Sequence, residues 1–283
     1  MDTYVASSSR EHWIRTGGPV TLIGEKINPT GRKKLAQALR DGDLEYIRQL
    51  ARQQAAAGAD LLDVNVGVPD VDDVALLPRV VREVAAEVDL PLCIDSANPA
   101  ALAAALSVAP GKPLVNSVNG KRASLEAVLP LVKDRGAAVI GLTMDEDGIP
   151  GMPEARAAIA ERIADRAVQI GIPLEDLLID PLVLTVGADD QAGIVTLRTI
   201  ELVRERLGVN INLGATNISF GLPERHVINQ AFLALSIRAG ASCVITDVAN
   251  LGLSIRAVEL LLGRDEYAGR YLSLFRLQQK TRT

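Results

Sequence analysis

The sequence is poor in aromatic residues and contains no block of basic residues. Aromatic residues make up 3% of its 283 residues, so the stacking platforms that bind single-stranded nucleic acid are scarce. The formal net charge is -5, and phosphate binding needs clustered Lys and Arg on one face. These absences argue against a nucleic-acid partner and favour a small ligand or a protein surface.

Cysteine and histidine are also scarce. Cys93 and Cys243 both lie in apolar runs, where a free thiol usually behaves as a small hydrophobic group. The only histidines, His12 and His226, are far from both cysteines in the sequence. No closely spaced ligand set predicts a zinc site, so we expect no protein-built metal site. A Cys-His nucleophilic pair is equally unsupported.

The two ends of the chain differ from its middle. Residues 1–18, MDTYVASSSREHWIRTGG, carry charges throughout and contain no apolar h-region. They therefore predict neither a signal peptide nor a membrane anchor, and a cytoplasmic location is the default expectation. We interpret residues 1–18 as a peripheral N-terminal arm. Residues 264–283 read as a charged helical tail that packs on the rest of the chain or against a second subunit.

Residues 19–263 alternate short apolar runs with amphipathic segments, a pattern typical of successive βα units. The expected strands lie near residues 20–24, 60–65, 91–95, 113–116, 137–142, 177–180, 209–214 and 242–246. The expected helices lie near residues 32–57, 71–88, 99–108, 124–135, 153–170, 190–206, 224–239 and 253–262. Eight such units predict a single closed (β/α)8 TIM barrel. An open doubly wound sheet is the alternative, but no G-x-G-x-x-G motif follows the first strand.

Most of the predicted strands run into a carboxylate or an amide. In a parallel barrel these carboxyl ends meet at one mouth, where catalytic groups are found. A mouth rich in hydrogen-bond acceptors suits a heterocycle with N–H donors, because a carboxylate can accept two parallel hydrogen bonds from an amino-amidine edge. Glu25 is followed by Lys26, which can neutralise it in a surface pair. The polar residues are Glu25, Asp63, Asn65, Asp95, Asn116, Asn119, Asp180 and Asn217.

Each of these residues also has a structural interpretation. Asp95 and Asp180 can cap helices or form loops, which is a common use of Asp in βα connections. Asn65 can make a turn, and Asn116 can belong to a loop network. The convergence of all of them on one end of the predicted barrel favours a ligand site.

Seven segments carry these polar residues or the loops near them: GEKINPTG, GADLLDVNVG, LCIDSANPAAL, LVNSVNG, GLTMDEDGIP, LLIDPLVLTVG and LGATNISFGLP. In this order and spacing they resemble the methyltetrahydrofolate:corrinoid methyltransferases and the pterin-binding module of cobalamin-dependent methionine synthase. The resemblance covers about residues 20–262. Both groups belong to the pterin-binding superfamily, which includes dihydropteroate synthase and uses a (β/α)8 barrel, so the resemblance implies the same fold.

The resemblance implies roles for single residues. Asp95, Asn116 and Asp180 match the positions that hold the pterin ring near its 2-amino group, N3 and N8. Asn217 matches the asparagine whose amide approaches N5, the nitrogen that carries the methyl group, and is the expected catalytic residue. The other expected substrate-binding positions are Asp63, Asn65, Gly214 and Ser219.

The implied activity is methyl transfer between N5 of methyltetrahydrofolate and the cobalt of a corrinoid, in one-carbon metabolism. The nucleophile would be Co(I) in an SN2 displacement, and N5 would need a hydrogen bond or a proton as its methyl bond breaks. One such donor can be worth about 3 kcal/mol in a transition state. The chain has no D-x-H-x-x-G motif for corrinoid binding, so we expect a separate corrinoid protein as partner. The resemblance also implies a homodimer, and either direction of transfer is compatible with it.

Two other functions are compatible with the motifs. A dihydropteroate synthase needs a basic group for pyrophosphate late in the chain, usually as Ser-Arg-Lys, whereas this sequence has Asn217, Ile218 and Ser219 there, with Arg225 further on. A folate-binding or pterin-binding protein without catalysis would retain the same polar mouth.

Overall fold

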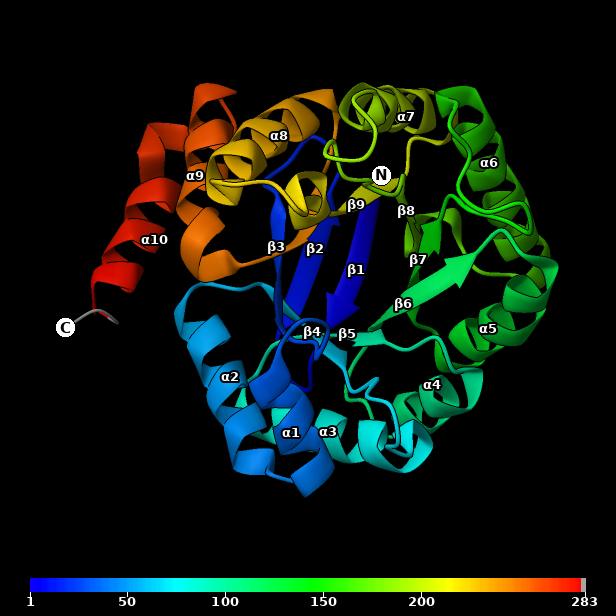
Figure 1. Cartoon of the computed structure of the whole chain (residues 1–283), viewed down its shortest axis with the longest axis vertical. Helices are drawn as coiled ribbons and strands as arrows, with labels where there is room; N and C mark the ends of the chain where they lie inside the picture. The colour runs from blue at the N-terminus through cyan, green and yellow to red at the C-terminus, as the bar shows by residue number, and fades with distance from the viewer. Residues whose placement is uncertain (281–283) are drawn as a thin grey trace.

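Eight parallel strands close into a barrel in the computed structural model, which describes residues 1–280 (Figure 1). The order around the barrel is β10-β3-β4-β5-β6-β7-β8-β9, so the expected (β/α)8 barrel is confirmed and the open sheet is not formed. The strands are β3 Thr21–Ile27, β4 Leu61–Asn65, β5 Leu92–Asp95, β6 Leu114–Asn119, β7 Ala138–Leu142, β8 Leu177–Asp180, β9 Asn210–Gly214 and β10 Cys243–Thr246.

Helices surround the barrel (Figure 1). The α-helices are α1 Lys33–Asp41, α2 Leu44–Ala56, α3 Asp73–Glu87, α4 Pro99–Leu106, α5 Arg122–Arg135, α6 Pro153–Ile170, α7 Ala192–Leu207, α8 Arg225–Ala239, α9 Val248–Leu261 and α10 Gly269–Lys280. Three short 3-10 helices are η1 Leu174–Asp176, η2 Ala215–Ser219 and η3 Glu266–Ala268. None of the helices within residues 1–280 is long and apolar enough to cross a membrane.

The segment expected as one helix over 32–57 is two helices. Gly42 ends α1 in the left-handed conformation, with φ of 68°, which glycine adopts without a steric penalty. The Asp43 side chain then accepts a hydrogen bond from the Tyr46 backbone N–H and begins α2. At the other end of the barrel sequence, α9 begins at Val248 rather than near residue 253.

The strands place apolar and polar side chains at opposite ends of the barrel interior. On β4, Leu62 and Val64 pack in the cluster between barrel and helices, whereas Leu61 belongs to the cluster inside the barrel. Because side chains alternate along a strand, Asp63 and Asn65 point inward as Leu61 does. The barrel interior is therefore apolar near its amino end and polar at its carboxyl mouth.

The first residues form a hairpin that closes the amino end of the barrel. Strands β1 Asp2–Ala6 and β2 Glu11–Arg15 pair antiparallel, and Figure 1 shows them across the barrel. Val5 and Ile14 are fully buried in the interior cluster. Asn210 of β9 donates to the Ile14 carbonyl at 2.9 Å. The expectation of a peripheral arm was wrong, because the open barrel end needs apolar side chains to cover it.

Residues 264–280 of the expected tail pack on the outside of the barrel through α10, which contacts α9, and residues 281–283 lie outside the described residues. Leu274 is buried, and a methyl group at Gly58 would lie only 2.5 Å from its Cδ1 atom. Gly58 therefore allows the close approach of α10 to the end of α2.

Candidate active site

Three of the predicted substrate-binding side chains lie on adjacent strands. In the barrel register Asn65 of β4 is the partner of Asp95 of β5, and Asp95 is the partner of Asn116 of β6. Asp180 ends β8, where its register partner is Leu142 of β7. The fold thus brings all four polar strand ends to the same mouth.

Asp63 lies one inward position below Asn65 and is fully buried. It accepts a hydrogen bond of 3.1 Å from Nδ2 of Asn116. Burial raises the pKa of Asp63 well above its ordinary value, and the nearby Asp95 carboxylate raises it further. Because the carboxylate of Asp63 is covered, we interpret it as a support for Asn116 rather than as a ligand contact.

Asp95 is more accessible and has amide neighbours. Burial raises the pKa of Asp95 to about 6, and a hydrogen bond from Asn65 opposes that rise. Nδ2 of Asn28 lies 3.4 Å from Oδ2 of Asp95. Within residues 1–280 no Lys or Arg forms an ion pair with Asp63, Asp95 or Asp180. A ligand with N–H donors would meet carboxylates that no protein cation neutralises directly.

Asp180 is 7% exposed, and burial raises its pKa to about 6. Its Oδ1 accepts from the Leu182 N–H at 2.9 Å. Its Oδ2 accepts from Nδ2 of Asn212 at 2.9 Å. The loop-forming role that the sequence allowed for Asp180 is therefore real, and it coexists with a place at the mouth.

Arg156 of α6 supports the loop that follows Asp180. Its side chain is 1% exposed and donates to the carbonyls of Pro181 at 2.9 Å and Leu182 at 2.8 Å. Neither Arg156 nor Asn212 was singled out in the sequence. Asn212 is a polar residue inside an apolar strand, which is a usable signal, whereas Arg156 resembles any arginine of an amphipathic helix.

Asn217 is exposed on η2, directly after β9. A methyl group at Gly214 would lie 3.3 Å from Nδ2 of Asn217, which is a tight contact and explains why a glycine suits this position. Ser219 is fully buried. It donates to Oδ1 of Asn229 at 2.7 Å and accepts from Nε of Arg225 at 3.1 Å. Ser219 thus braces the loop that carries Asn217.

Glu25 ends up with a partner other than the expected one. Its Oε1 accepts from Nη2 of Arg32 at 2.7 Å. Lys26 instead pairs with Asp247, which follows β10. The expectation that Lys26 neutralises Glu25 was wrong, because each of the two side chains has its own partner on a different segment.

Two asparagines have clear structural roles. Oδ1 of Asn119 accepts from the Lys121 N–H at 3.0 Å, at the start of α5. Oδ1 of Asn65 accepts from the Gly67 N–H at 2.7 Å, so Asn65 makes the turn that the sequence allowed. Asn65 is also the register partner of Asp95 and lowers the pKa of that carboxyl, so it lies between the turn and the mouth.

Two cavities open at the mouth. One of about 360 Å³ lies against the ends of β4 and β5, with Asn65 and Asp95 in its lining. The other, of about 390 Å³, lies beside β9, β10 and β3, and its lining includes Glu25, Thr216 and Arg225. Within residues 1–280 no group of three or more His, Cys, Asp and Glu side chains is arranged to hold a metal ion.

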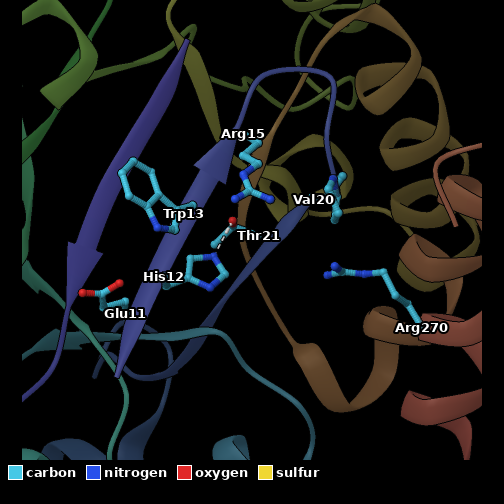
Figure 2. A pocket seen from close by; sticks show the side chains of 8 residues that line it. Glu11, His12, Trp13, Arg15, Val20, Thr21 and Arg270 are labelled. Carbon is cyan, nitrogen blue, oxygen red and sulfur yellow. Dashed lines mark hydrogen bonds between the residues drawn. The ribbon is translucent and has the colours of Figure 1, made fainter. Parts of the chain in front are cut away.

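A further cavity, of about 200 Å³, lies at the closed amino end (Figure 2). Trp13 and Arg15 of the hairpin and Arg270 of α10 are in its lining. His12 and Thr21 join across it by a hydrogen bond of 2.9 Å between Nε2 and Oγ1. This cavity is at the end opposite to the polar strand ends. Because barrel enzymes place their reactive groups at the carboxyl face, we assign the site to the mouth.

The barrel and its polar mouth define a (β/α)8 enzyme with a ligand site at the carboxyl ends of its strands. Residues 24–247 match the model of a protein family described as pterin binding enzyme. The chain belongs to this pterin-binding enzyme family, as the motifs in the sequence implied.

Relatives with similar sequences agree. The chain is 32% identical over 263 residues to a methylcorrinoid:tetrahydrofolate methyltransferase from Eubacterium limosum, covering 90% of this chain and 96% of that one. It is 33% identical over 245 residues to methionine synthase of Mycobacterium tuberculosis, covering 82% of this chain but 21% of that one. The chain is thus similar to one part of methionine synthase.

Solved structures show the same fold. Dihydropteroate synthase of Yersinia pestis superimposes with a TM-score of 0.71 at 17% identity, covering 92% of this chain and 99% of that one. Dihydropteroate synthase of Xanthomonas albilineans in complex with 7,8-dihydropteroate has a TM-score of 0.66 at 21% identity, covering 92% and 98%. At these identities the likeness concerns the barrel.

Proposed function

We propose that the protein is a methyltransferase that moves a methyl group between N5 of methyltetrahydrofolate and the cobalt of a corrinoid held by a separate protein. The observation that carries the proposal is the acceptor row of Asn65, Asp95 and Asn116 on neighbouring strands, with Asp180 at the same mouth. The similarity to the Eubacterium limosum enzyme over nearly its whole length supports the methyl transfer.

The reduced pterin ring has an amino-amidine edge that donates hydrogen bonds. Asp95 and Asp180 would accept from that edge, since a carboxylate can take two parallel N–H bonds. Asn116, which Asp63 supports from below, would read the adjoining ring nitrogen. Asn65, Gly214 and Ser219 would shape the pocket around the ring.

Asn217 is the proposed catalytic residue. When methyl leaves N5, the electron pair of the N–C bond stays on nitrogen, which must take up a proton or a strong hydrogen bond. The two electrons of the new carbon–cobalt bond come from Co(I), which becomes Co(III). An amide that donates to N5 lowers the activation free energy of methyl transfer when its hydrogen bond is stronger in the transition state than in the ground state. The exposure of Asn217 on η2, directly after β9, supports this role.

The partner would dock over the carboxyl face, so that cobalt can reach N5. Phe220, directly after η2, and Met152, directly before α6, are large apolar side chains that are 68% and 64% exposed on the carboxyl side. Exposed apolar side chains beside a polar site suit a transient protein contact. A cytoplasmic location and a homodimeric assembly belong to the same proposal, and sedimentation of the purified protein tests the second.

The decisive experiment follows methyl transfer to reduced cobalamin by absorbance, with methyltetrahydrofolate as donor. We expect turnover with the wild-type protein and a strong reduction in Asn217→Ala. Folate binding without any methyl transfer, to free cobalamin or to a corrinoid protein, would instead favour a non-catalytic folate-binding protein.

Calorimetric titration separates the proposal from a dihydropteroate synthase. We expect methyltetrahydrofolate to bind more tightly than pterin pyrophosphate, because the loop after β9 carries Asn217 where pyrophosphate would need a basic group. A preference for the pyrophosphate would overturn the proposed function.

A further inference from the structure

Asn212 is a buried amide inside the barrel that the proposed chemistry has not used. It is 1% exposed and lies on β9. Its neighbours Ile211 and Leu213 pack between the barrel and the helices, so the side chain of Asn212 points to the interior. It lies in register with Cys243 of β10 on one side and beside Asp180 of β8 on the other.

Asn212 provides the side-chain hydrogen bond to Asp180. Its Nδ2 atom donates to Oδ2 of Asp180 at 2.9 Å. The Leu182 backbone N–H donates to Oδ1 of the same carboxylate at 2.9 Å, and the Gly214 N–H is a further group that lowers the pKa of Asp180. A side-chain donor can be replaced without changing the backbone, so Asn212 is the donor through which the hydrogen bonding of Asp180 can be altered most directly.

Two other groups near Asp180, Arg156 and Cys243, do not supply such a side-chain hydrogen bond. Arg156 on α6 favours the ionised carboxylate only through its charge, because its hydrogen bonds go to the carbonyls of Pro181 and Leu182. The Cys243 thiol on β10 is buried, and its pKa is raised by burial, so it stays neutral.

The second polar atom of Asn212 is unusual. Its Oδ1 is buried and has no hydrogen-bond partner within residues 1–280. An unpaired buried acceptor is unfavourable, and turning the amide around would pair Oδ1 only with a protonated Asp180. The orientation in the structure, with Nδ2 toward Asp180, is the one that matches an ionised carboxylate.

We propose that Asn212 is a positioning residue that keeps Asp180 ionised and directed as the acceptor for the N–H donors of the reduced pterin ring. This inference rests on the proposed function, because it assumes that Asp180 reads the ring. Without the amide donor, the covered carboxylate would hold its proton to higher pH and would bind the ring as a neutral acid.

The test compares Asn212→Val with Asn212→Thr, two side chains of nearly equal size that differ in one hydroxyl donor. The dissociation constant of methyltetrahydrofolate is measured from pH 5 to pH 9. The acid limb is the part of the curve in which affinity falls as the pH is lowered. We expect Asn212→Val to shift this limb to higher pH by about one pH unit and to recover affinity at high pH. Asn212→Thr should move it less, because its hydroxyl can still donate.

Asn210→Val is the matched control. Asn210 lies on the same strand and is equally buried at 1%, but it donates to the hairpin at the closed end. We expect this variant to lose stability and to keep the wild-type acid limb. If Asn212→Val loses affinity equally at every pH, or if it matches Asn212→Thr, the inference is overturned and Asn212 serves packing alone.

The carboxyl 13C resonance of Asp180 in the ligand-free protein gives an independent readout, assigned by comparison with Asp180→Asn. Its titration should shift upward in Asn212→Val, and an unchanged titration would also overturn the inference. A wild-type protein that does not bind methyltetrahydrofolate would contradict the proposed function, while this resonance would still decide the role of Asn212.

Discussion

Nδ2 of Asn116 donates a hydrogen bond of 3.1 Å to Oδ1 of Asp63, which is 1% exposed. The amide on β6 is thereby oriented by a carboxylate on β4, across the intervening strand β5 and one inward position deeper than Asn65. On the adjacent strands β8 and β9 a buried amide, Asn212, in turn donates to the carboxylate of Asp180. Each proposed ring-binding side chain in these pairs is held by a buried partner that the ligand need not touch.

The first prediction concerns Asp63. Asp63→Ala removes the acceptor for Asn116, so the amide can rotate, and we expect methyltetrahydrofolate binding to weaken by about 1 to 3 kcal/mol. Asp63→Asn keeps an acceptor oxygen and should bind nearly as the wild type does. Calorimetry measures both, and an equal loss in the two variants would mean that the charge of Asp63, rather than its support of Asn116, matters.

Replacing Asp180 should weaken ligand binding. Asp180→Asn removes one charge-assisted contact to the ring, and we expect a loss of roughly 1.5 to 3 kcal/mol in methyltetrahydrofolate affinity. Titration at pH 8, where the wild-type carboxyl is ionised, measures it. Unchanged affinity would contradict the placement of Asp180 at the ring.

The same substitution should stabilise the protein above pH 6. The pKa of Asp180 is raised from 3.8 to about 6 by burial, so the folded protein holds this proton more tightly than the unfolded chain does. The stability that this proton contributes is present below pH 3.8 and is lost as the pH rises through 6. Above pH 6 the buried charge costs on the order of 3 kcal/mol, which Asp180→Asn avoids. Denaturant unfolding at pH 4 and pH 8 should therefore show an advantage for the variant only at pH 8. An advantage of equal size at both values would exclude this origin.

Asn217→Ala should reduce turnover more than binding. Its proposed hydrogen bond to N5 strengthens as the methyl group leaves, so its loss affects the transition state and should lower kcat by on the order of a hundredfold. Single-turnover methyl transfer and equilibrium binding measure the two effects separately. Equal losses in both would identify Asn217 as a contact of the ground state.

The hairpin should contribute strongly to stability. Ile14→Ala removes a fully buried side chain from the interior cluster, and we expect a loss of about 2 to 5 kcal/mol. Trp13 is the preceding residue on the same strand and is 45% exposed. Trp13→Ala is therefore the control, and it should lower the free energy of unfolding by less. Urea unfolding followed by circular dichroism compares them. Similar losses would mean that the hairpin is held mainly by its surface contacts.

The family and the barrel were predictable because both depend on local patterns. Parallel strands that are buried on both faces need apolar runs, and the crossover connections need amphipathic helices between them. The split between α1 and α2 was missed, although Gly42 and Asp43 are ordinary end and start residues of helices. The longer amphipathic pattern ran across both helices and obscured the break.

Partners of the site residues were less predictable. Glu25 bonds to Arg32 on the loop before α1, while Lys26 reaches Asp247 after β10. Asn28 contributes to the surroundings of Asp95 from another strand's loop. Such pairs join residues whose separation in the sequence carries no periodic signal.

The sequence by itself determined the alternation of strands and helices and the polar residues that end the strands, because burial and backbone pairing act on short segments. It also determined the family, through motifs in their order. Only the tertiary structure decided that residues 1–18 close the barrel, that Asp63 supports Asn116, and that Asn212 holds Asp180. These relationships depend on the closure and register of the barrel, which set side chains from distant strands within hydrogen-bond distance of one another.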